Sequence, residues 1–393
     1  MGAAMLVGVA QAHPEAAHLS PSTTLPRSRA AAHVTDPRAA SVAGMPQREA
    51  LLEAAETALA RGMVSTAILG FEQAAMMLHA ADTEMGLVRA WMQAGEYRRA
   101  LAFCAHTAGA HLDSPAASAL YVWLLRMGGQ DAFARRVLVQ TFERAPGDPV
   151  VDAVRQALES PSPAATGLLL DLPHRMAPLG TMQDAQPAPG GAQLVSSGVL
   201  MGDGLQAMVP LAAIAGARRL WVRNGLGHTT EAAIDATPEA LRAAGFAVLR
   251  LASKLDSGAV PLAPKDAFAG SPGYVIAYAA TRNASPAWPW LGQGFFGGFD
   301  GAAGMRKLGI ALPAELYGGP VLNAYGELAG ISVQGAVGQA TMLPVSMFAA
   351  FARENTNAAQ SIPAVGTAPA MRMASDEVYE RALRITLQVI VLP

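Results

Sequence analysis

The stretch "AELYGGPVLNAYGELAGISV", residues 314–333, decides the fold of the second half of the chain. Residues 320–323 predict a short apolar strand, residues 324–326 a turn, and residues 327–333 the returning strand of a hairpin. Two glycines and a proline predict a tight corner just before the hairpin. The segment therefore predicts a β-domain in which a bulky phenol, Tyr317, stands at a corner.

Length and composition exclude several classes of protein. The chain has 393 residues, of which 52% are apolar and 15% charged, enough for two or three domains with separate cores. No apolar run reaches the roughly 18–20 residues that cross a bilayer, so we expect no transmembrane segment. The net charge of -2 argues against nucleic acid as a partner. A single cysteine, Cys104, excludes an internal disulfide and a cysteine-based metal cluster.

Residues 1–44 predict a signal for export or a disordered segment. A short apolar stretch ends in Ala10-Gln11-Ala12, which matches an A-x-A cleavage pattern although the usual basic residues are missing before it. Residues 13–44 are rich in proline, serine, threonine and alanine, which predicts disorder. We therefore expect a periplasmic protein, with a cytoplasmic location as the alternative.

A helical repeat is predicted over residues 45–158. Three glycines, Gly62, Gly95 and Gly129, end the first helix of successive units at spacings of 33 and 34 residues. The residue five positions after each glycine is an alanine (Ala67, Ala100 and Ala134), and the residue nine positions after it is apolar (Phe71, Cys104 and Leu138). Pro146 closes the third unit. This pattern resembles the tetratricopeptide repeat, and it makes Cys104 a packing residue.

The resemblance implies that the concave face of the repeats binds a peptide. Five residues lie on or near that face by the register of the repeat: Met85, Arg89, Met92, Trp123 and Arg126. In the alternative interpretation, the methionines and the tryptophan form the core between repeats and the arginines are solvated surface. A protein or peptide partner is expected in the first case.

After a linker at 159–191, residues 192–353 predict an antiparallel barrel of short strands with glycine-rich turns. Four segments resemble segments of the trypsin-like serine proteases, particularly of the Deg/HtrA-type branch, and follow one another in the same order. They are "SSGVLMGDGLQAMVPLAAIAGARRLWV", "AAGFAVLRLA", "AELYGGPVLNAYGELAGISV" and "TMLPVSMFAAF". The resemblance implies α-helical repeats followed by an all-β, trypsin-like double β-barrel. The alternative is an ordinary β-barrel unrelated to proteases.

The catalytic residues of that family are missing from the matching positions. Acyl transfer needs a nucleophile, a base that is oriented by a carboxylate, and donors for the oxyanion. The register places the histidine position at Ala212, or at Leu211 or Ala213 after a one-residue shift. It places the aspartate position at Gly245 and the serine position at Tyr317. We therefore expect no enzymatic activity.

Other candidates for chemistry are weak. Glu315 replaces a glycine of the oxyanion site, where a carboxylate would repel a developing anion. His228 is a surface or ligand-contacting residue, and the phenylalanines of "GQGFFGGFDG" (292–301), Phe295, Phe296 and Phe299, are core or an exposed patch. The histidines form neither an H-x-x-x-H nor an H-E-x-x-H motif. We expect no metal and no cofactor.

Residues 354–374 predict a second linker, and residues 375–393 a short helix followed by the apolar strand "ITLQVIVL". An unpaired strand would aggregate, so we expect it to pair with the chain's own sheet, or alternatively with a partner subunit. The resulting hypothesis is a noncatalytic interaction or scaffold protein, a pseudoprotease in a bacterial envelope complex. The alternatives are a residual hydrolase with a non-standard nucleophile, and a maturation factor or accessory subunit of a larger complex.

Overall fold

The computed structural model describes residues 37–160, 163–182, 188, 190–258, 260–300, 304–333, 339–354 and 371–393, and the side chains from residue 44 onward within these ranges. Gly44–Pro393 forms one compact unit. The predicted export signal and most of the predicted linker at 354–374 lie outside the described residues. Among the described helices, none is both long and apolar enough to cross a membrane.

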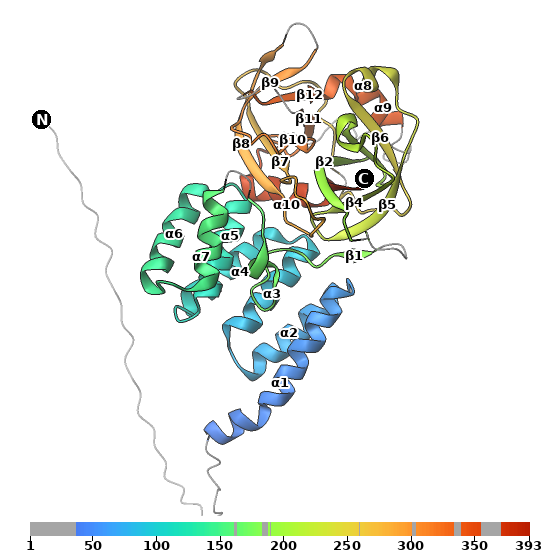
Figure 1. The fold of residues 1–393 in the computed structure, drawn as a ribbon. Coiled ribbons are helices and arrows are strands. Elements are labelled where there is room, and N and C mark those ends of the chain that lie inside the picture. The colour runs from blue at the N-terminus through green and yellow to red at the C-terminus, as the bar shows by residue number, and fades with distance from the viewer. Residues whose placement is uncertain are drawn as a thin grey trace, which may run out of the picture. The chain divides into compact units, whose positions relative to one another are not determined.

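The first part of the chain is a stack of helices (Figure 1). Its bounds are α1 (Pro37–Ala60), α2 (Val64–Met77), α3 (Ala81–Ala94), α4 (Tyr97–Ala110), α5 (Pro115–Met127), α6 (Asp131–Arg144) and α7 (Pro149–Glu159). Gly62, Gly95 and Gly129 each stand between the two helices of a pair with φ of 75°, 80° and 76°, a conformation that glycine adopts without strain. The predicted helical repeats are confirmed.

Small residues let the paired helices approach closely. Ala67, Ala100 and Ala134 are completely buried. A Cβ atom on Gly86 of α3 would lie 2.3 Å from the ring of Phe71 in α2, so this helix contact excludes any larger residue. Cys104 is also buried, which agrees with its predicted role in packing.

Residues 163–182, which belong to the predicted linker, pack against the repeats. They contain a 3₁₀ turn, η1 (Gly167–Leu170), and the short strand β1 (Thr181–Met182). The Arg89 guanidinium donates to the carbonyl of Pro173. The Gln93 amide donates to the carbonyl of Leu179 at 3.2 Å and accepts from its N–H at 3.1 Å. Met176 is completely buried, so this segment belongs to the core.

The second part of the chain forms two six-stranded barrels. One is built from β7 (Pro272–Ala277), β8 (Trp290–Phe299), β9 (Arg306–Gly309), β10 (Pro320–Asn323), β11 (Leu328–Val333) and β12 (Thr341–Pro344). Its strands follow the order β7-β8-β9-β12-β11-β10 and close back onto β7, all antiparallel. The hairpin predicted at residues 320–333 is the β10–β11 pair.

The other barrel comes earlier in the chain, so we call it the first barrel and the barrel of β7–β12 the second barrel. The first barrel is built from β2 (Gln193–Met201), β3 (Gln206–Pro210), β4 (Arg219–Asn224), β5 (His228–Ile234), β6 (Phe246–Leu251) and β13 (Thr386–Leu392). Its order is β13-β2-β3-β6-β5-β4, closing back onto β13, and β1 adds to β5 outside the ring. When β13 is counted as the first strand, both barrels share one strand order. β13 therefore fills in this barrel the place that β7 fills in the other. The prediction that the tail pairs with the chain's own sheet is confirmed.

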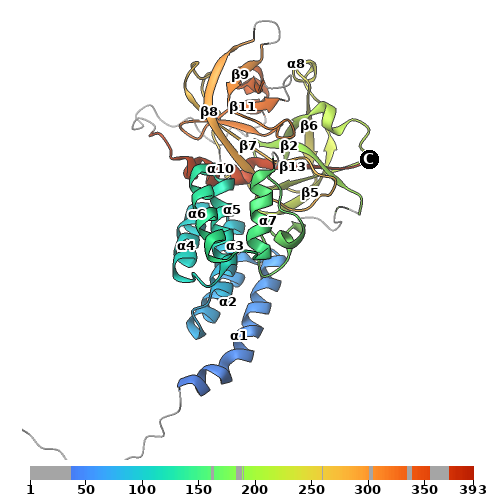
Figure 2. The ribbon, with the colours of Figure 1, turned by 60° about the vertical axis from the view of Figure 1, so that its left-hand side comes forward.

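The helix α10 (Ser375–Ile385), which leads into β13, joins the repeats to the barrels (Figure 2). The ring of Tyr379 meets that of Tyr97 edge-on at 4.5 Å, and its hydroxyl donates to the carbonyl of Pro289 at 2.7 Å. Arg98 pairs with Glu377 at 2.9 Å. The guanidinium of Arg384 donates to the last turn of α3 at 3.0 Å. One helix thus contacts both parts of the molecule.

We expect a charge in β13 to unfold the first barrel. Val389 is completely buried between β2 and β4, so Val389→Asp would leave an uncompensated buried charge and lower the free energy of unfolding by about 3–5 kcal/mol. Chemical denaturation followed by circular dichroism would measure this loss. Ile234→Asp is the matched control, because Ile234 is 59% exposed at a strand end. Equal effects of the two substitutions would contradict the role given to β13.

Candidate functional site at the junction of the barrels

The corner before β10 holds the two barrels together. Gly318 has φ of +83°, and a Cβ atom there would lie 2.3 Å from the carbonyl oxygen of Ser197 in β2. A Cβ atom on Gly319 would lie 2.0 Å from the carbonyl oxygen of Ile276 in β7. Each glycine therefore lets the corner touch one barrel, and any other residue would push that barrel away.

Ser332 of β11 fixes the corner from the other side. The N–H of Gly318 donates to the carbonyl of Ser332 at 2.9 Å, and the N–H of Gly319 donates to its Oγ at 3.1 Å. The N–H of Ser332 donates back to the carbonyl of Gly319 at 2.9 Å. These bonds hold the backbone of the corner in one position.

Tyr317 precedes the corner and spans the junction. Its carbonyl accepts from the N–H of Ser197 at 3.0 Å, and its hydroxyl donates to the carbonyl of Val195 at 3.4 Å. The side chain is half-buried, and this burial raises the pKa of the phenol above its usual value. The phenol is therefore a protonated donor near neutral pH, not an anionic nucleophile.

The other two predicted triad positions lie at the same junction. Ala212 belongs to η2 (Leu211–Ile214), and Gly245 comes directly before β6. The N–H of Leu211 donates to the carbonyl of Gly245 at 2.8 Å. Pro210, which precedes η2, comes within 2.8 Å of a Cβ placed on Gly318. The residues next to these three positions are therefore in contact, and the side chains at the positions themselves are a methyl group, a hydrogen atom and a phenol.

The remaining predicted site residues lie elsewhere or point to solvent. Glu315 is exposed. Burial lowers the pKa of His228, with Arg384 lowering it further and Asp256 opposing. Arg384 of α10 and Asp256 form an ion pair at 2.6 Å. Phe296 is core, whereas Phe295 and Phe299 are 52% and 56% exposed.

The residues predicted to bind a partner on the repeats are inside the molecule. Met85, Arg89, Met92 and Trp123 are at most 3% exposed. Arg126 pairs with Asp131, and its guanidinium lies 5.7 Å from the centre of the Trp290 ring. Arg89 and its neighbour Gln93 hold the chain's own segment at 173–179. A partner could use this face only by displacing that segment, so partner binding there stays a prediction.

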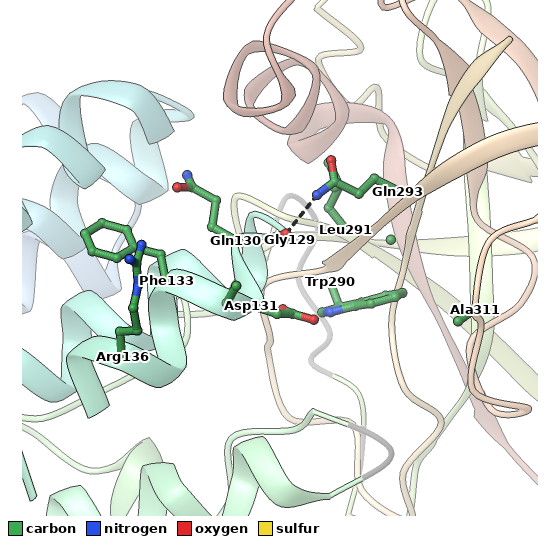
Figure 3. A pocket seen from close by; sticks show the side chains of 11 residues that line it. Gly129, Gln130, Asp131, Phe133, Arg136, Trp290, Leu291, Gln293 and Ala311 are labelled. Carbon is green, nitrogen blue, oxygen red and sulfur yellow. Dashed lines mark hydrogen bonds between the residues drawn. The ribbon is translucent and has the colours of Figure 1, made fainter. Parts of the chain in front are cut away.

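An open hollow of about 510 Å³ lies where the repeats meet the second barrel (Figure 3). On one side is the turn from α5 into α6, and on the other is the start of β8. We call the boundary between the repeats and this barrel the seam, and the cavity there the seam hollow. The Gln293 amide donates to the carbonyl of Gly129 across the seam at 3.1 Å. Its lining is mixed aromatic and polar: Gln130, Asp131, Phe133, Arg136, Trp290 and Gln293. Nothing in the sequence spacing links these two segments, so sequence reasoning missed this site.

Comparison with known proteins finds similar solved structures, and their sequence identity to this chain is low. No family model matches the chain, and no curated protein matches it. The chain is similar to the crystal structure of the MamO protease domain from Magnetospirillum magneticum in its apo form, with 18% identity and a TM-score of 0.33 over 42% of this chain and 91% of that one. It is also similar to the HtrA-type protease AlgW with a decapeptide, with 19% identity and a TM-score of 0.30 over 41% of this chain and 51% of that one, about half its length.

The predicted fold is confirmed: helical repeats precede a trypsin-like double β-barrel. The closed strand orders of the two barrels carry this conclusion, because each ring is complete and each follows the same connectivity.

Gly318→Ala should destabilise the junction. Alanine at φ of +83° is strained and its methyl would collide with Ser197, so we expect a loss of at least about 2 kcal/mol in the free energy of unfolding. Gly298→Ala is the control, because a Cβ there meets nothing within 4 Å. Thermal and urea denaturation of both variants would test this. A stable Gly318→Ala protein would contradict the described contact between corner and barrel.

Proposed function

We propose that this chain is a noncatalytic protein-binding scaffold, in which helical repeats are joined to a protease-like double barrel that has lost its chemistry. The observation that carries the proposal is the state of Tyr317. It stands where the resemblance places the nucleophile, yet its hydroxyl donates to the carbonyl of Val195 and burial raises its pKa. A group held in this way lines the junction and does not attack a substrate.

The surroundings of Tyr317 support the same proposal. General-base activation requires a titratable side chain within hydrogen-bond reach of the nucleophile. At the matching positions the chain has Ala212 and Gly245, and the neighbours Leu211 and Ala213 are equally unable to accept a proton. Because these positions act together in catalysis, the loss of all of them favours a retained fold over a retained reaction.

The seam hollow is the surface that we propose for the partner, which we take to be an extended segment of another protein. Its volume of about 510 Å³ falls within the usual range of roughly 300–1,000 Å³ for binding pockets. Phe133, Arg136 and Trp290 supply aromatic and arginine side chains, the types enriched at energetic centres of interfaces. The concave face of the repeats is covered by the chain's own segment, which favours the seam. We place this complex in the bacterial envelope, following the predicted export signal.

Absence of catalysis is tested with a fluorophosphonate probe and a peptide-cleavage library. We expect neither labelling nor cleavage by the full chain under conditions where an active trypsin-like protease reacts. Tyr317→Phe removes the only hydroxyl at the nucleophile position, and Tyr325→Phe is the matched control at an exposed turn. Activity that persists in Tyr325→Phe and disappears in Tyr317→Phe would overturn the proposal in favour of a hydrolase with a non-standard nucleophile.

The binding surface is tested by site-specific photo-crosslinking in native cells. A photoreactive amino acid at position 132, which lines the hollow, should give a defined protein adduct, whereas one at Gln140, exposed on the same helix, should not. Phe133→Ala and Arg136→Glu should weaken binding of the identified partner by about tenfold or more. Arg135→Glu is the control, because Arg135 is exposed outside the hollow. Equal binding by all three variants would exclude the seam.

A further inference from the structure

We propose that His79, Glu84 and His106 bind a divalent transition-metal ion of the Zn²⁺ class, with His111 as an additional imidazole at the same place. This site lies on the second helical repeat and does not depend on the function proposed above. One ligand atom from each of the first three residues lies within 4.8 Å of the others. Imidazole and carboxylate are the donors that Zn²⁺ and its neighbours prefer.

The fold assembles these residues from three elements. His79 lies in the turn between α2 and α3, and Glu84 lies in the first turn of α3. His106 lies near the end of α4, and His111 is the first residue after that helix. The His79 and His111 rings are 4.7 Å apart, and the His79 and His106 rings 6.1 Å. The packing of α3 on α4 therefore brings His79 to His106 and His111, which lie 27 and 32 residues further along the chain, a juxtaposition that no local motif reveals.

The distances suit coordination after small side-chain rotations. His79 Nε2 is 2.6 Å from Glu84 Oε1, and His111 Nε2 is 3.4 Å from Glu84 Oε2. Ligand atoms at about 2.0–2.2 Å from a tetrahedral Zn²⁺ ion lie roughly 3.3–3.6 Å from one another. An ion would thus move His79 outward by under about 1 Å, and the exposed side chain of His79 is free to make that movement.

Glu84 supplies the second, independent observation. Its side chain is only 4% exposed, and burying a carboxylate is costly unless a cation or hydrogen bonds compensate. Within the described chain, its ion-pair partners are the imidazoles of His79 and His111, which carry charge only when protonated. Glu84 Oε2 and His111 Nε2 are both buried and make no hydrogen bond to any described residue. A divalent cation would satisfy both atoms at once.

The arrangement also indicates how such an ion would be held. Glu84 and His111 form the buried side of the site, whereas His79 and His106 are exposed and close it from the solvent side. An ion would connect the turn before α3 to both helices of the second repeat. We therefore expect metal to raise the thermal stability of the chain.

The test uses the full chain, freed of metal by chelation and titrated with ZnCl₂. We expect one equivalent of Zn²⁺ to bind through this site by isothermal titration calorimetry, a rise in Tm, and the visible absorption of tetrahedral Co²⁺ when CoCl₂ replaces zinc. Glu84→Gln and His106→Ala should each weaken this binding by about tenfold or more and remove the rise in Tm. His174→Ala, a histidine of the segment on the repeats, is the matched control.

Glu84→Gln keeps the shape of the side chain and His106 is exposed, so both variants should fold, which circular dichroism in EDTA would verify. Zinc bound with unchanged affinity and stoichiometry by the Glu84→Gln/His106→Ala double variant would assign the metal to other histidines and overturn the proposal. The same holds if wild-type protein binds no zinc. Loss of binding in both single variants with retention in His174→Ala would establish the site.

Discussion

The pairing of β13 with β2 and β4 is the interaction on which the rest of this molecule depends. Without it the first barrel would be an open five-stranded sheet whose two edges expose unpaired backbone N–H and C=O groups, because β13 supplies the ladder hydrogen bonds for both neighbours. The same segment, through α10, places Tyr379 against Tyr97 and Arg384 against the end of α3. Closing the barrel and attaching the repeats are therefore one structural event.

The junction of the barrels shows which residues of its corner are fixed by packing. Gly318 and Gly319 are required by close backbone contacts with Ser197 and Ile276, which concern packing alone. At the neighbouring position, the Tyr317 hydroxyl adds a hydrogen bond to the opposite barrel. Packing therefore accounts for this corner without any reference to catalysis, which supports the scaffold role that we propose.

Much of the fold could be predicted from local pattern, and much of the site could not. The glycines at a period of 33 and 34 residues predicted the repeats because each must adopt positive φ, and the corner at 317–320 predicted the hairpin. By contrast, residues 163–182 were predicted to be a linker, because the residues that they contact, Arg89 and Gln93, are far from them in the sequence. The histidine cluster was missed for the same reason: helix packing, not spacing, brings His79 to His106.

The long stretch of chain between β4 and β13 also has a consequence for biogenesis. Domains that complete their cores early in the sequence can fold while synthesis continues. Here β4 ends at Asn224 and β13 begins at Thr386. The edges of β2 and β4 therefore stay unpaired until the ribosome has added some 160 further residues. The first barrel therefore closes only after translation has reached residues 386–392, and until then its open edges need protection from pairing with other chains.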